Sequence, residues 1–273
     1  MPFANLEDRA LLHLTGADTH AFLQGLLTQD IDTLAPQRPL WAGLLSPQGK
    51  ALFDMIVFDD GDGGVWLDCE AARADELARR LTMYRLKRAV AIVPSPVGVL
   101  AAWGESAKAG WPHDPRLAEL GLRSPGYPIA GAANAAVYRA HRYAHGVPEG
   151  AADLGIDRTL WLEADAVELN GVNFTKGCYV GQENTARMHH RDRVRRRLLP
   201  VTLGADPGAV RDILAGERVA GELRGWAGES GIAWLRIEHA ASPLTLGGAA
   251  VRVNWPAWLP VPVHEAVVPG PQS

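Results

Sequence analysis

The stretch Asn173-Phe-Thr-Lys-Gly-Cys-Tyr-Val-Gly-Gln-Glu183 decides how the rest of the chain is interpreted. It places Cys178, one of only two cysteines, between Gly177 and Gly181, with Lys176 two residues earlier. Glycine lets the backbone adopt positive φ and approach a ligand closely, and a neighbouring lysine favours the thiolate, the reactive form of cysteine. The pattern therefore predicts a reactive, partly exposed thiol. The alternative is a small buried side chain, because free cysteine is among the most buried residue types.

The densest positive charge in the chain follows directly. Residues 187–197 contain six arginines and two histidines. Three interpretations are open: a solvated basic strand, a site for an anionic ligand, or a contact for an acidic partner or RNA. Aromatic side chains, which stack on the bases of single-stranded nucleic acid, are missing from this run. We therefore favour structure and anion contact, and we do not expect direct nucleic-acid binding.

Length and composition fit a protein of two globular domains. The chain has 273 residues and a formal net charge of -4, so any affinity for nucleic acid must come from a local patch. No apolar run is long enough to cross a bilayer, and the N-terminus lacks the pattern of a targeting segment. We therefore expect a cytoplasmic protein without a membrane partner. Two distant cysteines, Cys69 and Cys178, cannot complete a zinc site or a four-cysteine iron–sulfur site, so no intrinsic metal is expected.

The periodicity predicts an α+β protein. Alternating apolar runs separated by turns indicate an antiparallel meander, and residues 71–88 and 134–146 have helical spacing. Short apolar runs separated by Gly, Pro and Asp turns begin near residue 197 and are typical of a small antiparallel β-barrel. We expect two domains, residues 1–196 and 197–273, with a further break near 94–97. The expected strands of the first domain are residues 9–15, 40–45, 50–58, 65–69, 90–93 and 97–103, and residues 112–128 are expected to be rich in loops.

The segment Lys176-Gly-Cys-Tyr-Val-Gly-Gln-Glu183 resembles the YgfZ family of folate-binding, iron–sulfur cluster maturation proteins. These are relatives of the glycine-cleavage T-protein, an aminomethyltransferase. Other motifs occur in the family's order, so the resemblance covers nearly the whole chain. They are Leu23-Gln-Gly-Leu-Leu-Thr-Gln-Asp30, Leu45-Ser-Pro-Gln-Gly-Lys50 with Phe53-Asp54, Asn170-Gly-Val-Asn173, and Thr185-Ala-Arg-Met-His-His-Arg191.

This resemblance implies a fold and a function. The fold is a T-protein-like folate-binding domain of antiparallel sheet and helices around a central cavity, followed by a small C-terminal β-barrel. The function is maturation or maintenance of [4Fe–4S] proteins, with tetrahydrofolate or a derivative as a non-covalent cofactor. The implied partners are an A-type iron–sulfur carrier and [4Fe–4S] client enzymes. Catalytic turnover is not required by this function, and the family's link to tRNA modification keeps a tRNA-contacting or scaffolding role as a further alternative.

The resemblance also suggests roles for single residues. Cys178 is the expected reactive thiol, and Lys176 either stabilises its thiolate, contacts the glutamate tail of folate, or is a solvated turn lysine. Glu163 is expected to bind the pterin, because a carboxylate accepts two parallel hydrogen bonds; the alternative is an edge-strand glutamate that faces water. The remaining expected cofactor-binding residues, several of which could equally shape the backbone or begin a helix, are Asp54, Gly177, Tyr179, Gly181, Gln182, Glu183 and Arg187.

Asp54 is where the sequence departs from the T-protein pattern. T-proteins carry a Gly-Gly pair followed by an Asp-Asp pair, whereas this chain has Gly49-Lys50 and Phe53-Asp54. A charge near the reacting amine assists aminomethyl transfer electrostatically. The loss of one carboxylate therefore makes a folate-dependent aminomethyltransferase the second choice. Asp54 is still expected to line the cavity.

Overall fold

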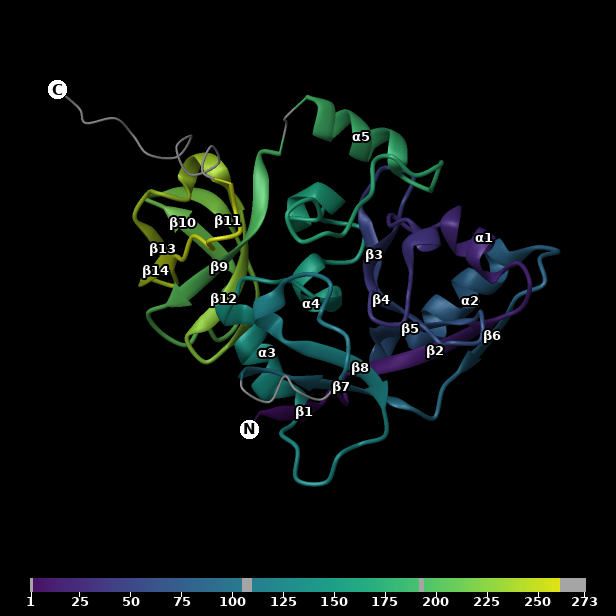
Figure 1. The fold of residues 1–273 in the computed structure, drawn as a ribbon. Coiled ribbons are helices and arrows are strands. Elements are labelled where there is room, and N and C mark those ends of the chain that lie inside the picture. Colours follow the sequence, from purple (N-terminus) through teal and green to yellow (C-terminus); the bar gives the residue numbers. More distant parts are fainter. Residues whose placement is uncertain (1, 105–109, 192–193, 261–273) are drawn as a thin grey trace.

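The computed structural model describes residues 2–104, 110–191 and 194–260. The described chain forms a five-stranded sheet, a three-stranded sheet and a closed six-stranded barrel, with short helices between them (Figure 1). The first two parts precede the barrel in sequence. The α+β prediction with a C-terminal β-barrel is therefore confirmed.

The five-stranded sheet has the order β3-β4-β5-β2-β6 and is antiparallel throughout. The predicted meander is present as β3, β4 and β5. Leucine and aromatic side chains on one face of the sheet form a common core with α1 and α2, and Figure 1 shows both helices together at the right of the view. The elements are β2 (Arg9–Thr15), α1 (Thr19–Gln24), β3 (Leu40–Leu45), β4 (Ala51–Asp59), β5 (Val65–Glu70), α2 (Ala74–Arg85) and β6 (Ala91–Pro94).

The three-stranded sheet brings together distant parts of the chain. Its order is β1 (Phe3–Asn5), β7 (Gly98–Ala102) and β8 (Leu122–Gly126), and α3 (Ala135–Ala144) shares its core. The chain passes from one sheet to the other between Pro94 and Gly98. Residues 112–128 were predicted to be rich in loops, and the strand β8 within them was not predicted. That strand contains Pro125, which an edge strand tolerates because no partner needs its missing N–H.

A buried network of arginines and carboxylates joins the two sheets. Asp68 on β5 accepts hydrogen bonds from Arg9 and from Arg123 on β8, both at 2.7 Å. Glu149 accepts from Arg123 at 2.6 Å and from Arg116 at 2.7 Å. Burial alone would raise the pKa of Glu149, but the surrounding arginines hold it well below its usual range. The ion pairs therefore compensate charges whose side chains are largely buried.

The barrel strands have the order β10-β11-β12-β9-β14-β13 and close on themselves. Leucine, isoleucine, valine and alanine side chains fill the interior. Buried Arg197 on β9 donates to Asp165 and Glu168, which lie in the segment before α5, and so ties the barrel to the first domain. The strands are β9 (Arg196–Leu203), β10 (Asp212–Ala215), β11 (Arg218–Ala227), β12 (Ser230–Arg236), β13 (Leu244–Leu246) and β14 (Ala249–Val253).

Three short helices follow α3 in the chain: α4 (Gly150–Leu154), η5 (Trp161–Ala164) and α5 (Gln182–His190). α4 lies between β4 and the barrel (Figure 1), and η5 contacts both β9 and α5. Trp41 and Trp161 pack against each other in the core beneath them, with ring centroids 4.7 Å apart. The other 3-10 helices are η1 (Ile31–Thr33), η2 (Ala71–Arg73), η4 (Ala118–Leu120) and η6 (Ile237–His239). In the described residues, no helix has the length and hydropathy of a membrane span.

Candidate functional site

The loop that precedes α5 presents Cys178 to solvent. Cys178 is exposed, whereas Lys176 and Tyr179 on either side of it are buried. Asn173 shapes the start of the loop, because its side-chain oxygen accepts from the backbone N–H groups of Thr175 at 2.8 Å and Lys176 at 3.0 Å. Two inward side chains thus anchor the loop and leave the thiol on the outside. The prediction of an exposed thiol is confirmed, and the buried alternative is wrong.

Lys176 anchors the loop by hydrogen bonds to backbone carbonyl oxygens, a role that the sequence analysis did not predict. Its Nζ donates to the carbonyl oxygens of Gln24 at 2.7 Å, Leu27 at 2.5 Å and Gln29 at 2.8 Å. The ammonium also lies 5.2 Å from the ring centroid of Tyr179. Burial lowers the pKa of Lys176 to about 8. All three N–H donors are used at the end of α1, so Lys176 ties the Cys178 loop to that helix and is not a solvated lysine.

The two glycines of the motif differ. Gly181 has φ of 86°, and a Cβ there would lie 2.6 Å from the carbonyl oxygen of Ser46. Gly181 is therefore required where the loop crosses the turn between β3 and β4. Gly177 has no positive φ, and a Cβ there would meet nothing within 4 Å. The expectation of a backbone requirement is wrong for Gly177; this glycine leaves open space next to the thiol.

The other residues of the motif build structure. Tyr179 belongs to the buried core beneath the loop, and burial raises its pKa to about 12. Gln182 and Glu183 form the first turn of α5, where an acidic side chain interacts favourably with the helix dipole. Asn184 fixes the helix on the turn below, since its Nδ2 donates to the carbonyl oxygen of Gln48 at 2.8 Å.

A strongly basic pocket of about 550 Å³ lies between α5 and the barrel. We call it the arginine pocket. Among the residues that the structure describes, five guanidinium groups line it together with one carboxylate, that of Glu163 on η5. Its lining residues are Leu160, Glu163, Asn184, Arg187, Met188, Arg191, Arg195, Arg196 and Arg236.

Glu163 connects the arginine pocket to the barrel. Its Oε2 accepts from the backbone N–H of Leu160 at 3.3 Å and from Trp234 Nε1 on β12 at 3.1 Å. Burial raises the pKa of Glu163. The guanidinium groups of Arg196 and Arg224 lie 4.3 Å and 5.1 Å from the ring centroid of Trp234. Glu163 is therefore a buried side chain with fixed partners, and the edge-strand alternative is wrong.

Asp54 is separated from Glu163 and from the arginine pocket. The Asp54 carboxylate accepts from the backbone N–H of Gly150 at 3.0 Å and from Trp41 Nε1 at 3.4 Å. The cavity beside it has a volume of only about 10 Å³, which is room for about one water molecule. The expectation that Asp54 lines a ligand cavity is wrong in this structure, because α4 begins directly over the carboxylate.

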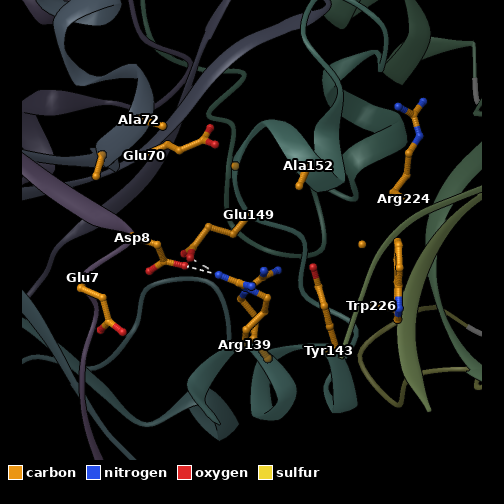
Figure 2. A pocket seen from close by; sticks show the side chains of 14 residues that line it. Glu7, Asp8, Glu70, Ala72, Arg139, Tyr143, Glu149, Ala152, Arg224 and Trp226 are labelled. Atoms are coloured by element: carbon orange, nitrogen blue, oxygen red, sulfur yellow. Dashed lines mark hydrogen bonds and ion pairs between the residues drawn. The ribbon is translucent and has the colours of Figure 1, made fainter. Parts of the chain in front are cut away.

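A second large cavity, of about 530 Å³, opens where the two sheets and the barrel meet. Figure 2 shows Glu7 and Asp8 across this cavity from Trp226 of β11, with Arg139 reaching Asp8 at 2.7 Å. None of the residues predicted as a site lines it. Sequence reasoning missed it because its walls come from five separate segments, and no local sequence pattern marks them as one site.

The structure thus divides the predicted residues into four groups. Gln182 and Glu183 begin α5 and lie outside the lining of the arginine pocket. Lys176, Gly177, Cys178, Tyr179 and Gly181 form the thiol loop. Glu163 and Arg187 line the arginine pocket, and Asp54 stands apart. Sequence reasoning noticed the basic run but did not foresee that Arg236, from the far end of β12, joins it; no local sequence signal marks that residue.

Cys178 is the candidate metal ligand of the thiol loop. Over residues 2–104, 110–191 and 194–260, no three His, Cys, Asp or Glu side chains are grouped as a metal site. The other cysteine, Cys69, is buried in the five-stranded sheet, and burial raises the pKa of its thiol to about 12. Cys178 is therefore the chain's one exposed thiol.

Comparison with known proteins gives the family. The model for the C-terminal β-barrel domain of CAF17 matches residues 195–261. The chain is 33% identical to the mitochondrial iron–sulfur cluster assembly factor IBA57 of Mus musculus and 34% identical to that of Homo sapiens. Each alignment covers 93% of this chain and 84% of the relative. The predicted relation to iron–sulfur maturation proteins is confirmed, whereas membership of the YgfZ family itself stays a prediction.

A solved structure has the same fold. The glycine cleavage system aminomethyltransferase T from Bartonella henselae superposes with a TM-score of 0.68, over 94% of this chain and 86% of that chain, at 13% sequence identity. This likeness concerns the fold alone.

The relatives correct one expectation and establish the family. Both mammalian proteins, and the homologue from Coccidioides immitis, are named as mitochondrial. The prediction of a cytoplasmic protein, which rested on an N-terminus without a targeting pattern, is therefore wrong. The chain belongs to the IBA57 family of iron–sulfur cluster assembly factors.

Proposed function

We propose that the chain matures iron–sulfur proteins by offering the Cys178 thiolate as a ligand to a cluster that a partner protein carries. Family membership supports the role in iron–sulfur protein maturation. The observation that carries the proposal is the exposed thiol between two buried anchors, Lys176 and Tyr179. A thiol that served only packing would lie inside, as Cys69 does.

The remaining ligands must come from the partner. Iron–sulfur clusters are usually held by four cysteine thiolates, and this chain exposes one. The proposed partners are an A-type carrier that delivers the cluster and [4Fe–4S] enzymes that receive it.

The proposed step is a ligand exchange without a change in redox state. The Cys178 sulfur forms a bond to one iron, and the bond from that iron to one thiolate of the carrier breaks. The proton released from Cys178 passes to the departing thiolate, so charge and electrons balance. Reversal of the exchange on a client enzyme completes the transfer.

Folate is proposed as a ligand of the arginine pocket. The chemistry of the donor set fits: Glu163 can accept from the N–H groups of a pterin, and five guanidinium groups can pair with the carboxylates of a glutamyl tail. When bound, a tetrahydrofolate would supply a reduced pterin that carries one-carbon groups. Glu163 and Arg196 would orient the ring, and the more exposed Arg187, Arg195 and Arg236 would hold the tail.

An aminomethyltransferase reaction is disfavoured by the surroundings of Asp54. Its carboxylate is already bonded to Gly150 and Trp41, and the adjoining cavity is about 10 Å³. A reacting amine could reach this carboxylate only if α4 moved away.

The role of the thiol is tested in cells that lack the endogenous protein. We expect Cys178→Ala to leave the activity of a [4Fe–4S] client enzyme at the level of the deletion, and Gly177→Ala, the matched control in the same loop, to restore it. Full restoration by Cys178→Ala would overturn the proposal.

Folate binding is tested separately by titration of the purified protein with tetrahydrofolate. We expect Glu163→Gln and Arg195→Gln each to weaken binding about 10-fold, which corresponds to loss of one good polar contact. Arg218→Gln, an exposed barrel arginine outside the pocket, should have no effect. Equal affinity in all three variants would place any folate elsewhere.

A further inference from the structure

The end of α2 exposes a group of large side chains that are surrounded in sequence by basic residues. Met83 is 66% exposed, Tyr84 38% and Leu86 83%. Five basic residues accompany them between positions 79 and 88, and the sequence contains no acidic residue from 77 to 104. We call Met83, Tyr84, Leu86, Lys87 and Arg88 the α2 apex.

Leu86 has a backbone conformation that leucine rarely adopts. Its φ is 52° and its ψ is -116°, which lies outside the left-handed helical region, where ψ is positive. Glycine adopts such positive-φ conformations readily, because it has no Cβ to clash with the backbone. The Leu86 side chain is mostly exposed, so burial in this molecule does not compensate for the strain.

The neighbouring chain holds this turn in place. The N–H of Ala89 donates to Asp18 Oδ2 at 2.7 Å, and the guanidinium of Arg85 donates to the carbonyl oxygen of Val90 at 2.9 Å. Gly16 lets the strand–helix connection pass so close that a Cβ there would lie 2.1 Å from the carbonyl oxygen of Ala89. Strained residues persist when their surroundings fix them in this way, and they are concentrated at functional positions.

The α2 apex and the thiol loop are attached to opposite ends of one short helix. Asp18, which holds the apex turn, is the N-cap residue of α1. Lys176, which holds the thiol loop, bonds to Gln24 and Leu27 at the other end of α1. The six residues of α1 rise about 9 Å along the helix axis. A single protein can therefore contact both features.

We propose that the α2 apex is a docking surface for the protein that brings the cluster, and that this protein presents an acidic surface with an apolar socket for Leu86. The inference rests on the proposed function of Cys178 and adds where the partner binds. The positive charge of the apex determines the sign of the partner's surface, and the protruding Leu86 requires a concave apolar contact.

The test measures binding of a purified A-type carrier to wild type, Leu86→Gly and the double variant Lys87→Glu/Arg88→Glu. We expect each variant to bind about 10-fold more weakly, the loss typical of a central interface residue. We also expect Leu86→Gly to raise the melting temperature by about 2–4 °C, because glycine relieves the strain. Val219→Ser, at an exposed valine on the barrel, is the control and should bind as wild type does.

The outcomes separate this inference from the proposed function. If wild type and Leu86→Gly bind the carrier equally well, the docking surface is wrong while the role of Cys178 stands. If the apex variants lose docking but Cys178→Ser retains it, docking at the apex is supported independently of cluster ligation. If wild type binds phosphatidylglycerol vesicles and Leu86→Gly does not, the apex is a membrane contact and the proposal is overturned.

Discussion

At the scale of single residues, the thiol loop is held by buried side chains on both sides of an exposed cysteine. Lys176 and Tyr179 are drawn inward, and Cys178 between them is held outward. A lysine two residues before a cysteine was expected to act on the thiolate through its charge. In the structure, the Lys176 ammonium instead donates three hydrogen bonds to backbone carbonyl oxygens. The sequence pattern alone cannot distinguish such a buried lysine from a solvated one.

We predict that Lys176→Met loosens the loop. The substitution keeps much of the apolar stem but removes three hydrogen bonds from a charged donor, and we expect it to lower the free energy of unfolding by about 3 kcal/mol. The backbone amides of residues 174–182 should also exchange hydrogen faster. Lys50→Met, a partly buried lysine in the β3–β4 turn, is the control. Unchanged exchange in Lys176→Met would show that the anchor is unnecessary.

The two motif glycines give a paired prediction. Gly181→Ala should destabilise the protein by about 2 kcal/mol, because it places a Cβ at positive φ and 2.6 Å from the oxygen of Ser46. Gly177→Ala should change stability by less than about 0.5 kcal/mol, as an open surface position does. Chemical denaturation of both variants measures the difference. Equal stability of the two would contradict the assigned backbone roles.

At the scale of secondary-structure elements, the sequence correctly predicted the helices and strands that have a clear local hydrophobic periodicity. The meander β3-β4-β5, the helices α2 and α3, and the short strands of the barrel follow from alternation and helical spacing. β1 and β8 were missed, since each is stabilised by pairing with the distant β7. The arginine pocket was missed as a unit for the same reason: Arg187 lies on α5, whereas Arg236 ends β12.

The contact between the sheets depends on Glu149, whose carboxylate accepts hydrogen bonds from the guanidinium groups of Arg116 and Arg123. We predict that Glu149→Gln destabilises the protein by about 3–5 kcal/mol, because it removes a counter-charge that buried Arg116 and Arg123 share and leaves them with Asp114 and Asp68 alone. Thermal unfolding measures the loss. Glu222→Gln, which removes an exposed ion pair with Arg158, should cost less than about 1 kcal/mol. A similar small effect for Glu149→Gln would mean that the network does not join the sheets energetically.

At the scale of the whole molecule, the barrel joins the first domain through a shared apolar core, to which Leu198 and Ile232 contribute, and through buried polar contacts. One of them, Glu163 to Trp234, predicts a dependence on pH. Burial raises the pKa of Glu163 above its unfolded value of 4.5, so the folded protein binds the proton more tightly. Stability from this group is present below pH 4.5 and is lost as pH rises through the folded pKa.

We therefore predict that, as pH rises from about 4.5 towards neutrality, wild type loses stability relative to Glu163→Gln. Glutamine keeps an oxygen that can accept from Trp234 but does not titrate, so it serves as the matched variant. Urea denaturation of both proteins across this pH range gives the comparison. A difference in unfolding free energy that stays constant with pH would contradict the assigned titration.

The most direct measurement of the proposed function is the ligation of a cluster by Cys178. Wild type, Cys178→Ser and Gly177→Ala are each mixed with a cluster-loaded A-type carrier, and the visible circular dichroism of the cluster is followed on complex formation. We predict that wild type and Gly177→Ala change the cluster spectrum in the same way and that Cys178→Ser leaves the carrier's own spectrum. An identical spectral change with Cys178→Ser would contradict the role of this thiol as a cluster ligand.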